Sequence, residues 1–466
     1  MSPPPHVPLD AWIAGRLRAA GLDPGDSPET FRAALTRWQA IRLAETLDHA
    51  RAHSLRYRKT LSPSLAETLR SRTAAGFAGP ALRGALAALP PTAPEELAGD
   101  PEAFLAVSPS EVEGVISVPS SGTSGKIKRV YATAEDLRDT VDFFAHGMRS
   151  LLDPGARVAM LMSGDRPGSV GDLFSRAMDQ AGMDCRILSP AAAEEDILAR
   201  LASFRPHCLV ALPGQALSLA RHPGAGALNP LSVLLSADAV SPVLAGAVAA
   251  GLGGPVFTHY GMTETGLAGA VECRERRGCH GREADLYLEI LDAGGQALDP
   301  EAHHGITPWG EIAVTTLTRR AMPLLRYRSG DRGRLITLPC PCGSSLHRLE
   351  VQGRLGERAP LRGGPGISLW DMDNCLYGLP FVSGFAVTAH YADKDCTRLA
   401  GLLLELRPTQ DAPADAPQRA EKALARLLPE GIPLRVLLSG DLPRTGKQAI
   451  RHLADPGGFR LPAPEA

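Results

Sequence analysis

Between residues 118 and 126 the chain reads Val118-Pro-Ser-Ser-Gly-Thr-Ser-Gly-Lys126, with an apolar, strand-like run on each side. Glycines let the backbone turn so that successive N–H groups point to one place, and the hydroxyls and the lysine add donors and positive charge. This composition suits a polyphosphate, although Ser/Gly-rich loops are more often mobile linkers. The stretch is not the Walker loop, because Ser120 replaces its first glycine and Ile127 follows the lysine. The candidate phosphate-binding residues are Ser120, Ser121, Gly122, Thr123, Ser124, Gly125 and Lys126.

The length and composition of the chain exclude several classes of protein. A chain of 466 residues is too long for one ordinary core, so two or more domains are expected. The formal net charge is -2 and no block of Lys and Arg stands out, which argues against a nucleic-acid partner. The chain has no long uncharged apolar run, no secretory signal at its start and only eight cysteines. We therefore expect a reduced, cytoplasmic protein with no membrane partner.

Hydrophobic periodicity predicts an α/β fold for most of the chain. Residues 1–110 are mainly helical in this prediction, and strands begin at Val115. Thr133 is expected to cap a helix, with Asp136 at its third position. Strands and helices then alternate as far as Thr258, and from residue 285 onward strands dominate. The pattern predicts a large domain of mixed α/β sheets with a β-rich subdomain.

The character of the sequence changes near Gly353-Arg354. Beyond this point we expect strands at 385–390, 402–406 and 434–439 and a helix at 418–428. These elements predict a small α+β domain of about a hundred residues, which is an ordinary domain size. The predicted division is an N-terminal domain over residues 1–352 and a small, mobile C-terminal domain over 353–466.

Two further motifs carry polar residues at the ends of predicted strands. The first is Thr258-His-Tyr-Gly-Met-Thr-Glu264, where Tyr260 offers a ring to a base and Glu264 is a hard oxygen ligand for Mg²⁺. Alone, this motif is equally compatible with a polar turn around a buried tyrosine. The second is Arg326-Tyr-Arg-Ser-Gly-Asp331, whose last residue can accept from ribose hydroxyls. By itself, this motif predicts an ordinary turn.

Five motifs therefore follow one another along the chain. They are the glycine-rich loop, the two motifs just described, Gly353-Arg354 and Leu442-Pro-Arg-Thr-Gly-Lys447. In that order the sequence resembles the adenylate-forming enzymes, a group of acyl-CoA synthetases, adenylation domains and luciferases. The resemblance runs from about Val115 to Arg451. Residues 261–273 and 315–356 are most similar to the phenylacetate–CoA ligase branch.

The resemblance implies a two-step reaction that uses ATP, Mg²⁺ and coenzyme A. A carboxylic acid is first activated to an acyl-adenylate with release of pyrophosphate, and a thioester with coenzyme A then forms. An aryl or arylacetyl acid is the expected substrate. Two alternatives stay open: transfer of the acyl group to a separate carrier protein or other acceptor, and a degenerate nucleotide-binding protein without catalysis. The sequence Gly353-Arg-Leu-Gly-Glu357 lacks the aspartates usual after the Gly-Arg pair, which weakens the prediction for the second step.

The resemblance also implies roles for individual residues. The loop from Ser120 to Lys126 would hold the β- and γ-phosphates, and Thr263 the α-phosphate. Lys447 would contact the reacting carboxylate and the α-phosphate, and Arg354 would lie at the domain junction. Asp331 would bind the ribose hydroxyls. The residues implied at the adenine and the metal are Ser236, Ala237, Asp238, Tyr260, Gly261, Met262 and the Mg²⁺ ligand Glu264.

The cysteines suggest a second, structural metal. Cys340 and Cys342, with Cys273 and His280, make a plausible tetrahedral set of three sulfurs and one nitrogen for Zn²⁺. Cys279 competes with His280 for the fourth position. The alternative is a group of reduced, buried cysteines, which are common in cores. A closed shell of this kind leaves no open coordination position, so the zinc would be structural.

Overall fold

The computed structural model describes residues 7–64, 67, 71, 79–119, 127–164, 166–228, 231–361, 364–440, 442 and 449–454. The glycine-rich loop from Ser120 to Lys126 and the segment with Lys447 lie outside the described residues. Contacts between residues divide the chain into two compact units. The first consists of Met1–Ala156, Ser163–Ile187 and Phe257–Val351, and the second of Arg157–Met162, Leu188–Val256 and Gln352–Ala466.

The first unit begins with helices, as predicted. Ser27 starts the longest of them, because its hydroxyl accepts from the N–H of Thr30 while the Thr30 hydroxyl accepts from the N–H of Ser27. The predicted helix over 63–77 falls largely outside the described residues. The helices before the first strand are α1 (Pro8–Ala19), α2 (Pro28–His53), α3 (Leu55–Thr60), α5 (Gly79–Ala87) and α6 (Pro94–Gly99), with 3₁₀ turns η1 (Pro101–Phe104) and η2 (Pro109–Glu111).

An antiparallel hairpin of β1 (Gly114–Pro119) and β2 (Ile127–Ala132) flanks the glycine-rich loop. Helix α7 (Ala134–Arg149) follows directly. Thr133 caps it as predicted, accepting from the N–H of Asp136 at 3.2 Å, while the N–H of Thr133 donates to the Asp136 carboxylate at 2.9 Å. Helix α8 (Val170–Ala181) packs against α7, and β4 (Asp184–Ile187) follows it.

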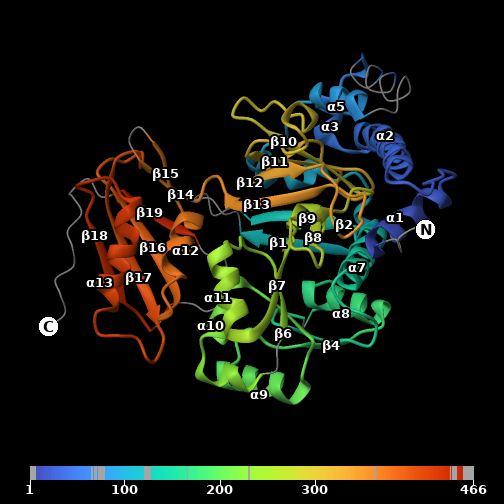
Figure 1. The fold of residues 1–466 in the computed structure, drawn as a ribbon. Helices are drawn as coiled ribbons and strands as arrows, with labels where there is room; N and C mark the ends of the chain where they lie inside the picture. Colours follow the sequence, from blue (N-terminus) through green and yellow to red (C-terminus); the bar gives the residue numbers. More distant parts are fainter. Residues whose placement is uncertain are drawn as a thin grey trace. The chain divides into compact units, whose positions relative to one another are not determined.

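In the part of the large mixed sheet that belongs mainly to the first unit, the strands lie in the order β10-β11-β12-β13-β9-β8-β7 (Figure 1). Their bounds are β7 (Gly253–Tyr260), β8 (Ala270–Glu272), β9 (Cys279–Gly281), β10 (Leu286–Leu291), β11 (Gly310–Thr316), β12 (Tyr327–Ile336) and β13 (Arg348–Arg354), with the turns η4 (Thr263–Thr265) and η5 (Glu301–His303). The motif from Arg326 to Asp331, whose composition taken alone suggests an ordinary turn, leads into β12, because Tyr327 to Asp331 are the first residues of this strand. Gly330 has a φ of +75° at a shift in the register between β11 and β12, so the turn-like composition marks a bulge inside a strand.

The second unit contains a parallel sheet and a separate small sheet. The parallel strands lie in the order β6-β5-β3, and the small sheet has the order β18-β17-β16-β19, drawn in orange and red in Figure 1. The elements of the parallel part are β3 (Arg157–Met160), α9 (Glu194–Phe204), β5 (Cys208–Ala211), α10 (Pro213–Ala220), η3 (Pro223–Ala227), β6 (Leu231–Leu235) and α11 (Pro242–Leu252). The C-terminal elements are β14 (Arg358–Leu361), β15 (Gly364–Ser368), α12 (Leu369–Leu376), β16 (Val382–Tyr391), β17 (Leu399–Pro408), α13 (Ala416–Leu424), η6 (Ala425–Leu427), β18 (Leu434–Leu438) and β19 (Ile450–Ala454).

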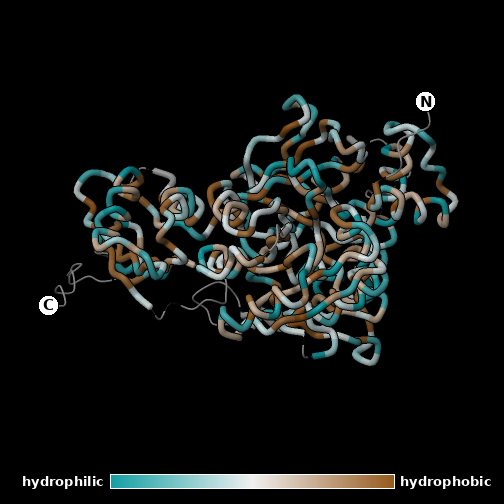
Figure 2. Tube along the Cα trace, turned by 60° about the horizontal axis from the view of Figure 1, so that its bottom comes forward, coloured by the Kyte–Doolittle hydropathy of each residue, from teal (hydrophilic) through white to brown (hydrophobic). Residues whose placement is uncertain are grey.

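This arrangement confirms the predicted fold class, an α/β protein with a large mixed sheet and a separate small C-terminal sheet. Hydrophobic and hydrophilic residues alternate over short distances along the chain (Figure 2), as expected when each element buries one face. Within the described part of the chain, no helix is both long enough and apolar enough to cross a membrane.

Candidate functional site

Two of the predicted nucleotide-binding residues meet in the first unit. Tyr260 is the last residue of β7 and Asp331 lies in β12, and the Tyr260 hydroxyl donates to Oδ2 of Asp331 at 3.0 Å. Burial, and then the negative charge of Asp331, raise the pKa of Tyr260 well above its ordinary value. The phenol therefore stays protonated and holds the Asp331 carboxylate in place. The structure thus brings together two motifs that are far apart in the sequence.

The predicted magnesium ligand, Glu264, is buried in the turn η4. Its Oε1 accepts from the Lys128 ammonium at 2.5 Å and from the Tyr327 hydroxyl at 2.8 Å, and Lys128 also donates to the Tyr327 hydroxyl at 2.9 Å. Burial alone would raise the pKa of Glu264, but the charge of Lys128 and the two hydrogen bonds outweigh it and hold that pKa below its ordinary value. Glu264 is therefore an ionised carboxylate, as a ligand of Mg²⁺ must be.

Sequence reasoning missed Lys128 and Tyr327. It assigned the positive charge of the loop to Lys126, whereas among the described residues it is Lys128, in β2, that reaches Glu264. One available signal was the scarcity of lysine, since the chain has only six and two of them stand at positions 126 and 128. Tyr327 lies inside a quoted motif, but only its place in β12 shows that its hydroxyl points to Glu264.

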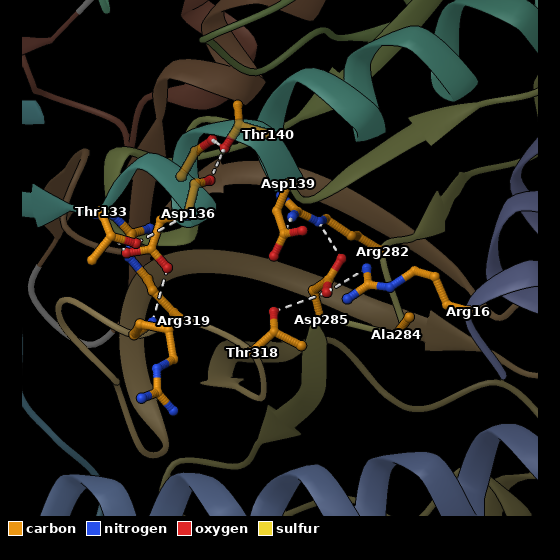
Figure 3. Close-up of polar contacts among 12 residues, drawn as sticks. Arg16, Thr133, Asp136, Asp139, Thr140, Arg282, Ala284, Asp285, Thr318 and Arg319 are labelled. Atoms are coloured by element: carbon orange, nitrogen blue, oxygen red, sulfur yellow. Dashed lines mark hydrogen bonds and ion pairs between the residues drawn. The ribbon is translucent and has the colours of Figure 1, made fainter. Parts of the chain in front are cut away.

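Helix α7 and a nearby arginine fix the backbone of the turn that carries Glu264. The Thr140 hydroxyl, on α7, donates to the carbonyl of Gly266 at 2.9 Å. The buried guanidinium of Arg319 donates through Nη1 to the carbonyl of Glu264 and through Nη2 to the carbonyl of Tyr131, both at 3.2 Å. Figure 3 shows Thr140 on α7 and Arg319 below the start of this helix, near Asp136. Strand β2, which follows the glycine-rich loop, and the Glu264 turn are thereby joined through one side chain.

A network of buried charges lies farther along α7 (Figure 3). Asp285 accepts from Arg282 at 2.6 Å and from the Thr318 hydroxyl at 2.8 Å, and it forms an ion pair with Arg16 at 2.7 Å. Asp139 lies 4.0 Å from Arg282 in the same network. Burial, followed by the negative charge of Asp285, raises the pKa of Asp139 to about 6. The two aspartates therefore compete for the positive charge of the two arginines, and Asp285 lies closer to both of them than Asp139 lies to Arg282.

The replacement Asp139→Asn is expected to stabilise the protein at neutral and alkaline pH. The pKa of about 6 in the folded chain exceeds the ordinary aspartate value, so the folded state binds more protons and loses stability as pH rises from about 4 to 6. The variant should gain about 2 kcal/mol at about pH 8 and almost nothing at about pH 4 in urea unfolding. Asp153→Asn, at a side chain that is 88% exposed, is the matched control. A gain independent of pH would contradict this account.

In the second unit, two other predicted site residues line one cleft. Asp238 and Arg354 both border a cavity of about 360 Å³, together with Asp373 of α12. Leu442 and Ala449, the nearest described residues on either side of Lys447, border it as well. The carboxyl of Asp373 is buried, and among the described residues its Oδ1 has no hydrogen-bond partner. Burial, and then the charges of Asp238 and Glu357, raise the pKa of Asp373 well above its ordinary value.

The segment from Ser236 to Asp238 follows β6 directly. The N–H of Ser236 donates to the carbonyl of Ala211 at 3.1 Å, and Ala237 has a φ of +70°, a conformation that L-residues rarely adopt. Residues in such conformations cluster at functional sites.

The four predicted zinc ligands come together in the first unit. One ligand atom from each of Cys273, His280, Cys340 and Cys342 lies within 4.8 Å of the others. Nδ1 of His280 lies 3.2 Å from the carbonyl of Leu346, while its Nε2 lies 3.3 Å from Sγ of Cys342. A histidine ligand is commonly fixed in this way, with one ring nitrogen bound to a carbonyl and the other free for the metal.

The structure also decides between the two candidates for the fourth ligand. Cys279 turns away from the cluster, because its Sγ lies 3.3 Å from the hydroxyl of Thr258 and 3.5 Å from the Thr258 carbonyl. Neighbouring residues of a strand point to opposite faces, so His280 in β9 faces the other three ligands instead. The residues present therefore fit the tetrahedral set of sulfur and nitrogen donors that Zn²⁺ prefers.

Comparison with known proteins gives partial matches in sequence. No protein-family model matches the chain. Over 276 residues it is 31% identical to a phenylacetate–coenzyme A ligase of Thermus thermophilus, an alignment that covers 56% of this chain and 59% of that protein. A phenylacetate–coenzyme A ligase of Aromatoleum evansii is 26% identical over 257 residues, with 52% and 55% covered. The chain thus spans between 55% and 59% of the length of these two curated relatives.

Solved structures match over much more of the chain. A 2-hydroxyisobutyryl-CoA ligase in its postadenylation state has a TM-score of 0.72 at 18% identity, with 90% of this chain and 89% of that chain covered. The ATP-bound MatB from Rhodopseudomonas palustris has a TM-score of 0.52 at 16% identity, with 74% and 68% covered. At such low identity these matches establish the fold alone. The chain therefore has the fold of the adenylate-forming CoA ligases, and among these enzymes it resembles the phenylacetate–coenzyme A ligases in sequence.

Proposed function

We propose that this protein is an AMP-forming acid–CoA ligase that activates a small carboxylic acid. One observation carries the proposal: Glu264, in the motif shared with the adenylate-forming enzymes, is a buried carboxylate kept ionised by Lys128 and Tyr327. The Tyr260–Asp331 pair supports it, since a ring and an acceptor for ribose hydroxyls suit a nucleoside. We further propose that the site includes the loop from Ser120 to Lys126, Thr263 and the segment from Ser236 to Asp238.

The reaction itself needs no protein nucleophile. An oxygen of the substrate carboxylate attacks the α-phosphorus of ATP, a P–O bond forms, and the bond to pyrophosphate breaks to give the acyl-adenylate. This step brings one anion to another, so cations that neutralise the growing charge lower the barrier. Mg²⁺ held by Glu264 would supply such charge, and Lys128 and Lys447 would supply the rest. Much of the remaining catalysis is positioning of the two reactants.

The second step would form a thioester. The thiol sulfur of coenzyme A attacks the acyl carbon, the bond to AMP breaks, and the thiol proton is released. We propose that residues 353–466 move as a domain about a junction near Arg354 and withdraw Lys447 for this step, while residues 1–352 hold the nucleotide. The expected acid is aryl or arylacetyl, by likeness to the phenylacetate–coenzyme A ligases. Gly356 and Glu357 stand where aspartates are usual, which keeps a carrier protein as the alternative acceptor.

Pyrophosphate release across a panel of acids, measured with and without coenzyme A, tests the proposal. A ligase releases pyrophosphate with its acid and consumes coenzyme A in equal amount. If pyrophosphate is released at the same rate without coenzyme A, and no coenzyme A is consumed when it is present, the carrier-protein alternative is favoured. Failure to release pyrophosphate with every acid of the panel would favour a nucleotide-binding protein without catalysis.

We also propose that Cys273, His280, Cys340 and Cys342 hold one structural Zn²⁺. Metal analysis of the purified protein is expected to find about one zinc per chain, because a closed set of three thiolates and one imidazole binds zinc tightly. Cys340→Ser should lose most of this zinc and unfold at a lower temperature. Cys185→Ser, outside the cluster, should keep it. Zinc-free protein from zinc-supplemented cells would contradict the assignment.

A further inference from the structure

We infer that the metal site of Cys273, His280, Cys340 and Cys342 positions Tyr260 against Asp331, so that the bound metal sets the affinity for the nucleotide. This inference rests on the proposed function, since it assigns the Tyr260–Asp331 pair to the nucleotide. The cluster would then do more than stabilise the fold. A chain of contacts leads from it to Tyr260, and the polypeptide itself leads from Cys340 back along β12 to Asp331.

The first chain of contacts leads to Tyr260. Cys273 follows β8 directly, and β8 pairs with β7 so that Tyr260 stands opposite Ala270. Glu272, the neighbour of Cys273, accepts through its carboxylate from the N–H of Thr258 at 2.7 Å. The backbone just before Tyr260 is thus held by the residue next to a metal ligand.

The second connection, to Asp331, runs along the polypeptide. Cys340 and Cys342 lie in the connection between β12, which carries Asp331, and β13. The guanidinium of Arg348 fastens this connection, because it donates to the carbonyl of Leu338 at 3.0 Å and to that of Arg277 at 2.7 Å. Arg277 belongs to the loop between Cys273 and His280.

A metal bound to all four ligands therefore joins the β8–β9 side, which holds Tyr260, to the β12–β13 side, which holds Asp331. Four bonds to one ion fix two segments that are otherwise linked here by hydrogen bonds. Metal loss should let the segments shift, and a hydrogen bond at 3.0 Å weakens steeply when its geometry changes. A hydrogen bond to a charged acceptor is worth a factor of about 10 to 100 in an equilibrium constant, so its partial weakening should lower the affinity for AMP severalfold.

A double-mutant cycle separates positioning from a general loss of stability. The dissociation constant for AMP is measured by calorimetry for the wild type, Cys342→Ser, Tyr260→Phe and the double variant. Cys342→Ser is expected to weaken AMP binding about fivefold in the wild-type background and less than about twofold in the Tyr260→Phe background. The inference would be overturned if Cys342→Ser raised the dissociation constant for AMP by the same factor in both backgrounds, or did not change it in either.

Three controls complete the experiment. His280→Cys keeps four ligands and should retain both zinc and wild-type affinity for AMP. Leu173→Ala, at a fully buried side chain of α8 in the first unit, should lower the unfolding temperature without weakening AMP binding. Should Cys342→Ser fail to fold, the wild type is stripped with a chelator and reloaded with zinc, and AMP affinity must fall and then return. A wild type that holds zinc but does not bind AMP would instead contradict the proposed function.

Discussion

Replacing Lys128 by methionine is expected to slow acyl-adenylate formation by about 100-fold or more. Lys128 is the cation nearest to the buried Glu264 carboxylate among the residues that the structure describes, and its ammonium also bonds to Tyr327. Without it, Glu264 would be a buried carboxylate that keeps the Tyr327 hydrogen bond but has lost its compensating charge. Its pKa would rise, and a protonated Glu264 cannot hold Mg²⁺. ATP–pyrophosphate exchange measures the loss directly.

The pH dependence of this variant adds a second readout. Because the pKa of Glu264 rises when the Lys128 charge is removed, activity in Lys128→Met should recover partly as pH increases. Lys59→Met, at an exposed lysine of α3, is the matched control and should behave as the wild type does. Exchange at the wild-type rate in Lys128→Met would contradict the role given to Lys128.

Replacing Lys447 by alanine is expected to abolish acyl-adenylate formation, with a loss of about 1,000-fold or more, while ATP still binds. In the proposed reaction Lys447 meets the carboxylate and the α-phosphate only as they react. A contact made only in the transition state lowers the rate when lost and leaves ground-state binding intact. Exchange kinetics and calorimetry of ATP binding measure the two quantities separately.

The matched control is Lys422→Ala, at an exposed lysine of α13 in the same C-terminal part of the chain. It should leave both the exchange rate and ATP binding unchanged. Full ATP–pyrophosphate exchange in Lys447→Ala would remove Lys447 from the reaction. Weakened ATP binding in that variant would contradict the division between binding and catalysis.

Local signals in the sequence predicted local structure well. The cap at Thr133 depends on Asp136 three residues away, and both hydrogen bonds are formed. By contrast, the motif from Arg326 to Asp331 gives no local sign of a strand, because its glycine and serine are typical of turns. Only the pairing with β11 shows that the chain continues as a strand through a bulge at Gly330.

Some residues of the candidate site could not be identified from the sequence because they depend on contacts between distant parts of the chain. The contact of Lys128 with Glu264 spans 136 positions, and nothing in the local sequence distinguishes Lys128 from Lys126. The cluster of Cys273, His280, Cys340 and Cys342 was predictable as a set because few combinations of cysteine and histidine suit a tetrahedral ion. The choice between Cys279 and His280 was not predictable from the sequence. Adjacent residues of a strand face opposite sides of the sheet, and only the fold shows which of the two faces Cys340.

The identity of the nucleotide product tests the central claim most directly. The purified protein is incubated with ATP, Mg²⁺, coenzyme A and a panel of aryl, arylacetyl and short aliphatic acids, and the nucleotides are separated by chromatography. Attack at the α-phosphorus predicts AMP and pyrophosphate in amounts equal to the acyl-CoA formed with the preferred acid. Formation of acyl-CoA with ADP and inorganic phosphate would contradict the account, because it requires attack at a different phosphorus.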